Sequence, residues 1–214
     1  DASVNEEIDK LRLKATESLL TRNDVIVVSS VSSIYGIGSP KEYQKKVVKI
    51  FKNEKINIRN LCRELVEIYY NRNDAVFERG NFRVRGDLIE IYPAYENYGL
   101  RIELFGNNID SIYYFDPISG NVLDNLESIF IYPAKHFVAD DEMINNVIDN
   151  IKDELNDRLE WLRSNNKLLE AQRLEQRTNF DIEMMLEVGY CSGIENYSMY
   201  FSERKKGERP YTLF

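Results

Sequence analysis

The sequence predicts an α+β protein in which a small antiparallel-sheet domain with one packed helix is flanked by a strand–helix unit and by a helical hairpin. Apolar residues recur every three or four positions near the amino terminus, around residues 57–70 and after residue 142, as in amphipathic helices. Between about residues 75 and 135 the apolar period falls to two, which is typical of strands. These changes of period place domain boundaries at residues 1–45, 46–136 and 137–214.

Residues 1–45 are expected to form part of an α/β sheet. The first helix opens with a capping box at Ser3 and Glu6, and its apolar positions at helical spacing are Ile8, Leu11, Ala15 and Leu19. The run "DVIVVSSVSS" is rich in β-branched residues and apolar on both faces, as in a parallel strand covered by helices. Ser39 as N-cap and Pro40 then begin a helix that continues through "KEYQKKVVKIF".

Residues 46–136 are predicted to form one helix followed by short strands. The helix "IRNLCRELVEIYY" places four apolar residues on one face: Ile58, Leu61, Leu65 and Ile68. The runs that follow as strands are "AVFERGNFRVRG", "DLIEIYPAY", "LRIELFGNNIDSIYYFD" and "LESIFIYPA". Turn residues separate them at Gly86-Asp87, at Gly106-Asn107-Asn108 and at positions 117–120. This pattern predicts an antiparallel sheet with one helix packed against it.

The last third of the chain is predicted to be a helical hairpin. Its first helix carries an apolar stripe at Ile144, Ile148, Ile151, Leu155, Leu159 and Leu162. The letters "RSNN" interrupt the pattern, and a second helix, "LLEAQRLEQRTNFDIEMMLEVG", ends at Gly189. The stripe covers about two heptads, which is too short to predict a coiled-coil partner, so we expect packing within the hairpin.

Composition excludes several classes of protein. Acidic residues outnumber basic ones by 36 to 28, and the charge of −8 argues against broad nonspecific binding to nucleic acid. Cys62 and Cys191 lack CxxC spacing, and His136 is the one histidine, so the sequence predicts neither a zinc site nor a disulfide framework. We expect His136 to be a partly buried residue at the end of a strand. No apolar run approaches the length of a membrane span, and the polar start without methionine suggests an internal piece of a longer protein.

Catalytic machinery is not recognisable in these residues. The phosphate loop G-x-x-x-x-G-K-[ST] is absent, and "YGIGSPK" offers Gly36 and Gly38 without a third glycine. No serine has the context of a nucleophile elbow, and an isolated histidine gives acid–base catalysis no organiser. From these residues alone we do not predict an enzyme.

Residues suited to binding are better represented, and they gather in the middle domain. In "NFRVRG", Arg83 and Arg85 alternate with apolar residues, so both are expected on one exposed strand face. The same domain contains Arg72, Arg101 and Glu103. Arginine pairs bidentately with carboxylates, which suggests an acidic partner surface, whereas a solvated strand face is the simpler alternative. If the arginines are exposed, reversing the charge of both Arg83 and Arg85 leaves the fold intact.

Five stretches, in order and over nearly the whole chain, resemble the UvrB family of the bacterial excinuclease ABC. They are "DASVNEEIDKLR", "VSSVSSIYGIGSPKEY", "RGNFRVRGDLIEIYPA", "KLLEAQRLEQRTNFDIEMM" and "GYCSGIENYS". Ser33 stands where the family often has cysteine, a change that conserves size.

The resemblance implies a fold and a partner for each part of the chain. Residues 46–136 would be the UvrA-interaction domain, and the flanks would be pieces of a RecA-like helicase motor domain. The family's UvrA contacts fall on Arg72, Arg83, Arg85, Arg101 and Glu103, and its DNA-surface roles fall on Arg12, Arg177 and Glu195. The alternative function is DNA binding by this chain itself, through Arg12, Arg177 and the tyrosine-rich C-terminal segment.

The resemblance also implies what lies outside this chain. The family's Walker A loop, DExx motif and tyrosine-rich hairpin would lie beyond its ends, so this piece is expected to have no catalysis and no cofactor. Mg-ATP, damaged DNA and UvrC would then belong to the full-length protein, which we expect in the bacterial cytoplasm without membrane contact. Without the rest of the motor sheet, the strand around residues 25–31 would be exposed or covered by another copy.

Overall fold

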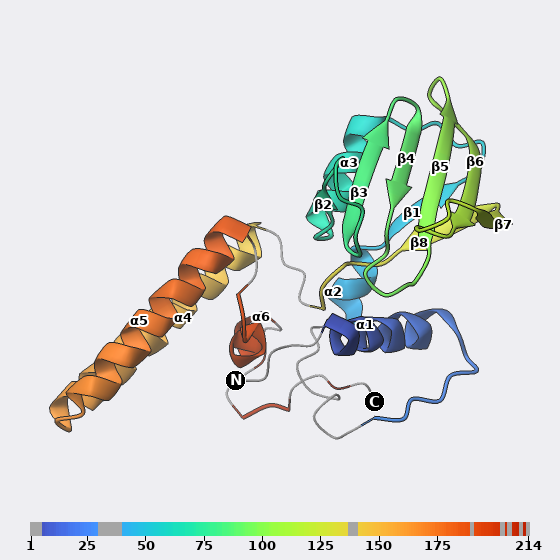
Figure 1. Cartoon of the computed structure of the whole chain (residues 1–214). Coiled ribbons are helices and arrows are strands. Elements are labelled where there is room, and N and C mark those ends of the chain that lie inside the picture. The colour runs from blue at the N-terminus through green and yellow to red at the C-terminus, as the bar shows by residue number, and fades with distance from the viewer. Residues whose placement is uncertain are drawn as a thin grey trace. The chain divides into compact units, whose positions relative to one another are not determined.

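The runs of alternating residues form a six-stranded sheet of order β2–β3–β4–β5–β6–β7 in the computed structural model (Figure 1). Its strands are β2 (Asn71–Arg72), β3 (Asn81–Arg85), β4 (Leu88–Ile91), β5 (Gly99–Phe105), β6 (Asn108–Phe115) and β7 (Val122–Leu126). Neighbours from β3 to β7 are antiparallel, and β2 is parallel to β3. A two-residue turn with Gly86 at φ +63° joins β3 to β4, a backbone conformation that favours glycine. The predicted α+β class is confirmed.

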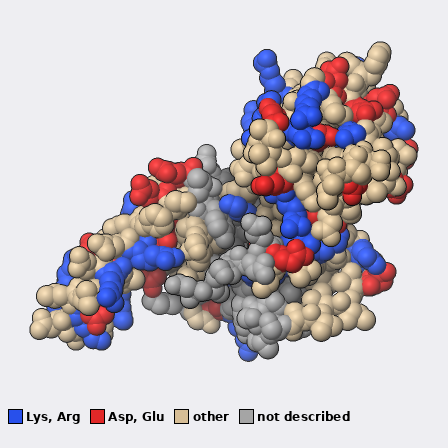
Figure 2. Space-filling model, viewed as in Figure 1, with Lys and Arg blue, Asp and Glu red and all other residues tan. Residues whose placement is uncertain are grey.

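The structure describes residues 6–29, 40–136, 141–188, 191–201, 204, 207–209 and 212. The chain divides into a first unit, Asp1–Ser30 with Tyr43–His136, and a second unit, Val31–Glu42 with Phe137–Phe214. Basic and acidic side chains are intermixed on the visible surface of both units (Figure 2). The predicted helix caps at Ser3 and Ser39 lie outside the described residues.

A separate two-stranded sheet, β1 (Val48–Phe51) paired with β8 (Ser128–Ile131), corrects two predictions. The helix predicted through residue 51 is wrong in its second half, because α2 (Pro40–Lys45) ends and the strand β1 follows. Val48 and Ile50 are buried while the residues between and after them are exposed, which is strand alternation. Strand β7 was not predicted, and β8 pairs with β1 rather than with the larger sheet.

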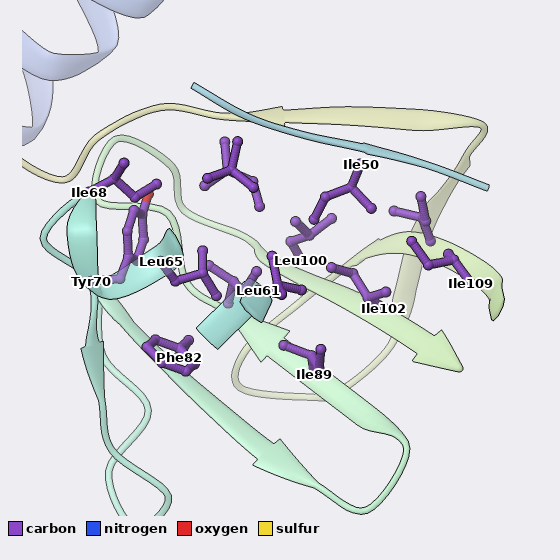
Figure 3. Close-up of a cluster of buried hydrophobic side chains, with 14 of the residues drawn as sticks. Ile50, Leu61, Leu65, Ile68, Tyr70, Phe82, Ile89, Leu100, Ile102 and Ile109 are labelled. Atoms are coloured by element: carbon purple, nitrogen blue, oxygen red, sulfur yellow. The ribbon is translucent and has the colours of Figure 1, made fainter. Parts of the chain in front are cut away.

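The core of the first unit lies between the six-stranded sheet and the elements that cover one of its faces, α3 (Ile58–Glu67) and the β1–β8 pair (Figure 3). The predicted helix face is confirmed, since Leu61, Leu65 and Ile68 are all buried. Asn57 caps this helix by accepting hydrogen bonds from the backbone of its first turn. The sheet contributes buried side chains from alternate positions: Phe82, Ile89, Ile91, Leu100, Ile102 and Ile112. The opposite, outer face of the sheet is therefore where its polar residues lie.

Tyrosine hydroxyls hold the irregular segment after β8, where the chain leaves the first unit. Tyr132 donates its backbone N–H to the hydroxyl of Tyr95 at 3.1 Å, and its carbonyl accepts from the hydroxyl of Tyr70 at 3.1 Å. The carbonyl of Pro133 accepts from the hydroxyl of Tyr43 at 3.2 Å. These side chains satisfy backbone groups that would otherwise be buried without a partner.

Helix α1 (Glu6–Thr21) forms as predicted but buries a different face. Leu13 and Thr16 are buried, whereas the predicted apolar positions Ile8 and Leu11 are more than half exposed. The buried face packs through polar contacts: Lys14 pairs with Glu96, and the Thr16 hydroxyl lies 3.1 Å from Nε2 of His136. Contacts with the rest of the first unit, and not the apolar stripe, thus determine which face of α1 is buried.

The buried strand predicted from residue 25 onward is wrong for its described part. Residues 25–29 have no regular structure, and Ile26 and Val28 are 91% and 94% exposed. No described strand pairs with this run, and a strand needs a neighbour for its backbone hydrogen bonds. The predicted exposure of this apolar run is confirmed as far as residue 29.

The second unit is built on the hairpin of α4 (Asp141–Ser164) and α5 (Leu168–Val188), followed by a 3₁₀ helix (Ile194–Tyr197) and α6 (Ser198–Phe201). The predicted stripe is confirmed, since all six of its residues are buried. The larger of the two described clusters in this unit also contains Val147, Ile182, Met185, Cys191, Ile194 and Phe201. The predicted stop at Gly189 lies outside the described residues.

Candidate functional site on the outer face of the sheet

Two rows of side chains cross the outer face of the sheet, and strand register sets both. Residues directly opposite one another on β3, β4, β5 and β6 form the clamp row, which consists of Arg83, Glu90, Arg101 and Tyr113. Two positions along each strand, toward the β3–β4 turn, the second row consists of Arg85, Leu88, Glu103 and Ser111. The sheet therefore brings four of the five predicted UvrA-contact residues onto one face, with Arg72 on neighbouring β2.

Glu90 lies at the centre of the clamp row and binds both of its arginines. One carboxylate oxygen accepts from Nε of Arg83 at 2.5 Å; the other accepts from Nε of Arg101 at 2.7 Å and lies 2.6 Å from its Nη2. The Glu90 side chain is 3% exposed, and those of Arg83 and Arg101 are 17% and 20% exposed. The expectation that Arg83 is an exposed cation is therefore wrong. Reversing its charge would set a second carboxylate against a buried one, so the fold is not expected to tolerate it.

Aromatic rings support both guanidinium groups. The Cζ of Arg83 lies 4.4 Å from the ring centre of Phe77, and that of Arg101 lies 4.3 Å from the ring centre of Phe115. The two rings stack on each other with centroids 5.8 Å apart. Gly99, opposite Phe115 on β5, leaves the space that the Phe115 ring occupies, because a Cβ there would overlap it. Glu90 and the stacked rings together fix the two guanidinium groups.

Hydrogen bonds extend the clamp row into the second row. Tyr113 donates to one oxygen of Glu103 at 2.5 Å, and the Ser111 hydroxyl donates to the other at 2.9 Å. These two bonds lower the pKa of Glu103 below its ordinary value, so it is ionised at neutral pH. Burial lowers the pKa of Arg101, but hydrogen bonds to Tyr113 and Glu90 outweigh it and leave that pKa raised.

Arg85 differs from the other arginines because it is exposed and forms no ion pair with any described residue. Arg72 is held by Asp74, whose carboxylate also accepts from the backbone N–H of Val84 at 3.1 Å. The Val84 bond and the Arg72 pair lower the pKa of Asp74. Over the two rows, three arginines against two glutamates leave one positive charge, and Figure 2 shows basic and acidic side chains mixed over this unit.

Sequence reasoning missed Glu90, Phe77, Phe115 and Asp74. A signal for Glu90 was available, because a two-residue turn at Gly86-Asp87 pairs Arg85 with Leu88 and therefore Arg83 with Glu90. Nothing in the sequence indicates that Phe77, from the loop before β3, folds over the outer face of the sheet.

Comparison with known proteins places these elements in a family. The profile of the UvrB interaction domain matches residues 48–137, and that of the UvrB third helical domain matches residues 142–203. UvrABC system protein B of Methanosphaera stadtmanae is 54% identical over 213 residues, which are 100% of this chain and 33% of that protein. The chain belongs to the UvrB family.

Two further UvrB relatives give the same result. UvrABC system protein B of Syntrophotalea carbinolica is 55% identical over 215 residues, covering 100% of this chain and 32% of that protein. The Prochlorococcus marinus (strain MIT 9313) protein of the same name is 56% identical over 212 residues, covering 99% of this chain and 31% of that protein. The chain thus spans about a third of the length of the curated UvrB relatives it matches.

The three residues with DNA roles implied by the UvrB resemblance are described to different extents. Arg12 lies on α1 in the first unit, where its carbonyl accepts from the Thr16 hydroxyl at 3.1 Å. Burial and then the charge of Arg12 lower the pKa of His136 to about 4. His136 is thus a neutral, buried residue at neutral pH, more buried than predicted. The side chain of Glu195 lies outside the described structure.

Arg177 lies on α5 in the second unit, beside an open cavity of about 960 Å³. Its Nε donates to Asp181 at 3.0 Å, which raises the pKa of Arg177, and its Nη2 donates to the carbonyl of Ser192 at 3.1 Å. Tyr197 donates to the same carboxylate at 2.8 Å. Asp181 is buried while the Arg177 side chain is 61% exposed. This network ties α5 to the segment that follows it, and a DNA role for Arg177 stays a prediction.

The described ranges contain no candidate metal site and no candidate membrane span. No group of three or more His, Cys, Asp or Glu there could hold a metal ion. No helix there is long and apolar enough to cross a membrane.

Proposed function

We propose that this chain binds UvrA through the outer face of its six-stranded sheet, as the interaction part of a UvrB protein in nucleotide excision repair. The observation that carries the proposal is the pair of side-chain rows on a sheet that lies within the segment matched by the UvrB interaction domain. The relatives' name, UvrABC system protein B, supports a partner within that system.

The chemistry of the face suits a partner that presents carboxylates. Arginine forms strong charge-assisted bonds with carboxylates, and here the arginines stand on paired strands. Because the strands and the clamp row are already ordered, binding requires little additional loss of conformational entropy. Glu103 lies on the same strand as Arg101 and is ionised at neutral pH, so it supplies an acceptor for a basic group on the same partner.

Arg85→Glu tests the proposal most cleanly, because this exposed side chain has no ion pair among the described residues. The variant is titrated onto immobilised UvrA beside the unaltered chain, after circular dichroism has established that it is folded. Placing like charges across the interface should weaken binding by about tenfold or more. Binding of the unaltered chain should also fall as salt rises. Unchanged affinity for the folded variant would show that this face does not contact UvrA.

Arg59→Glu is the matched control, since Arg59 is exposed on α3 and the change of charge is identical. Helix α3 covers the inner face of the sheet, so this variant should bind UvrA normally. Equal losses from Arg59→Glu and Arg85→Glu would mean that net charge, and not the outer face, governs binding.

For the whole protein, which is about three times as long in its relatives, we propose ATP-dependent verification of DNA damage with UvrC as a further partner. Mg-ATP and damaged DNA would be its ligands, and residues 1–45 and 137–214 would belong to its RecA-like motor domain. DNA binding by this chain alone has less support, because Arg177 is engaged by Asp181 and the chain carries a charge of −8.

A further inference from the structure

Glu90 is a buried carboxylate at the centre of the outer face, and its surroundings are unusual for a sheet. Glu90 is 2% exposed, and no other Asp, Glu, Lys or Arg among the described residues of the six strands is buried. A carboxylate taken out of water destabilises a fold unless close cations and hydrogen bonds compensate for the lost hydration. Arg83 and Arg101 supply that compensation from the two neighbouring strands.

The bonds to Glu90 determine which parts of the arginines remain for a partner. Arg83 uses its Nε, and its terminal amino groups have no hydrogen bond to any described residue. Arg101 donates its Nε to Glu90, its Nη2 lies 2.6 Å from the same oxygen, and its Nη1 donates to the Tyr113 hydroxyl at 3.4 Å. Each guanidinium is therefore held along its inner edge by Glu90 and on one face by an aromatic ring.

We propose that Glu90 is a positioning residue for partner binding: it holds the guanidinium groups of Arg83 and Arg101 in the orientation that carboxylates of an acidic partner surface engage. The inference rests on the proposed binding of UvrA and deepens it. Glu90 itself touches no partner, since two arginines and the strands cover its carboxylate.

This role and a purely electrostatic role predict opposite changes when the Glu90 charge is removed. The two rows together carry one positive charge, and neutralising Glu90 raises it to two. If only charge governed binding, an acidic partner would then bind more tightly. If orientation governs binding, the released arginines must be ordered again at each encounter, and the partner binds less tightly.

Glu90→Gln, which keeps the size of the side chain, decides between these outcomes by titration of the full 214-residue chain onto UvrA. We expect a loss of about tenfold or more, chiefly in the dissociation rate. Glu90→Asp keeps the charge on a shorter side chain, so its affinity for UvrA should lie between those of the unaltered chain and of Glu90→Gln. Glu64→Gln makes the identical change at an exposed position on α3, which covers the inner face of the sheet, and should leave binding unchanged.

Side-chain NMR tests whether Glu90 holds the two guanidinium groups in solution, which the positioning role requires. In the unaltered chain, the Nε–H signals of Arg83 and Arg101 should exchange with water far more slowly than that of Arg85. In Glu90→Gln this protection should disappear while the backbone amides of β4 keep theirs. If Glu90→Gln does not fold, the unaltered chain still decides, because unprotected Arg83 and Arg101 signals would overturn the inference.

The outcomes also separate this inference from the proposed function. Equal or tighter binding by folded Glu90→Gln, together with loss of binding by Arg85→Glu, would refute the positioning role alone. Unchanged binding by both variants would refute the binding face itself.

Discussion

Gly99→Ala tests whether the aromatic support of the outer face is as closely packed as the structure indicates. A Cβ at Gly99 would lie 2.5 Å from Cζ of Phe115 and closer still to Cε1. Because carbon atoms pack optimally at about 3.5–4.0 Å, the ring must retreat by about 1 Å. Phe115 is 1% exposed, its ring stacks on Phe77, and the Arg101 guanidinium lies 4.3 Å from its centre, so neighbouring side chains restrict its movement.

The expected destabilisation follows from two opposing effects. Overpacking a closed site costs about 1–3 kcal/mol. Replacing glycine also restricts the unfolded chain, which returns about 0.4–1 kcal/mol. We therefore expect Gly99→Ala to destabilise the first unit by about 1–2 kcal/mol.

Urea unfolding followed by tyrosine near-UV circular dichroism measures this change in the first unit. Fluorescence of Trp161, the one tryptophan, reports the helical hairpin in parallel and should not change. Adding Phe115→Leu makes room for the new methyl group, so the two changes together should cost about 0.5–3 kcal/mol less than their sum. Strict additivity, or a Gly99→Ala variant as stable as the unaltered chain, would show that the Phe115 ring is not confined.

Two further predictions concern His136 and the hairpin. The low pKa of His136, about 4 against 6.5 when unfolded, means that the unfolded state binds more protons between these values, so stability falls as pH falls. Lowering the pH from 7 to 5 should reduce the stability of the first unit by about 2 kcal/mol through this group. In urea titrations, the stability of His136→Gln should therefore fall by about 2 kcal/mol less than that of the unaltered chain over the same pH change. An equal fall in both proteins would exclude His136 as the cause. Leu159→Ala should destabilise the hairpin by about 2–5 kcal/mol, because Leu159 is 3% exposed between α4 and α5. Trp161 fluorescence during urea unfolding measures this loss, and an unchanged midpoint would contradict the packing.

Local patterns predicted the parts of the fold that depend on neighbours close in sequence. The stripe on α4 and the face of α3 were read correctly, because a helix buries residues three and four positions apart. The hairpins of the sheet were likewise recognisable, since Gly86 and Gly106 occupy two-residue turns at positive φ. The same turns set the register that aligns the outer face.

Contacts between distant segments decided the parts that sequence patterns missed. Strand β1 forms because Val48 pairs with Ile131, 83 positions away, although the letters around it suit a helix. The face of α1 is set by His136 and Glu96, which lie far along the chain. Glu90 was not identified as buried, because an isolated acidic residue in a strand is usually exposed. The β3–β4 turn indicates its pairing with Arg83, but the pairing with Arg101 depends on the register of β5 as well.

The tyrosine-bound segment after β8 has a mechanical consequence. Tension on the chain beyond His136 first meets the contact of His136 with Thr16 and the bond from the Ala134 N–H to the Ile68 carbonyl, and then the segment at Pro133 and Tyr132. Three hydroxyls, from α2 and from the loops after α3 and β4, divide that tension among separate anchor points. The force is therefore spread over α1, α2 and the loops after α3 and β4, so no single strand of the sheet has to carry it alone.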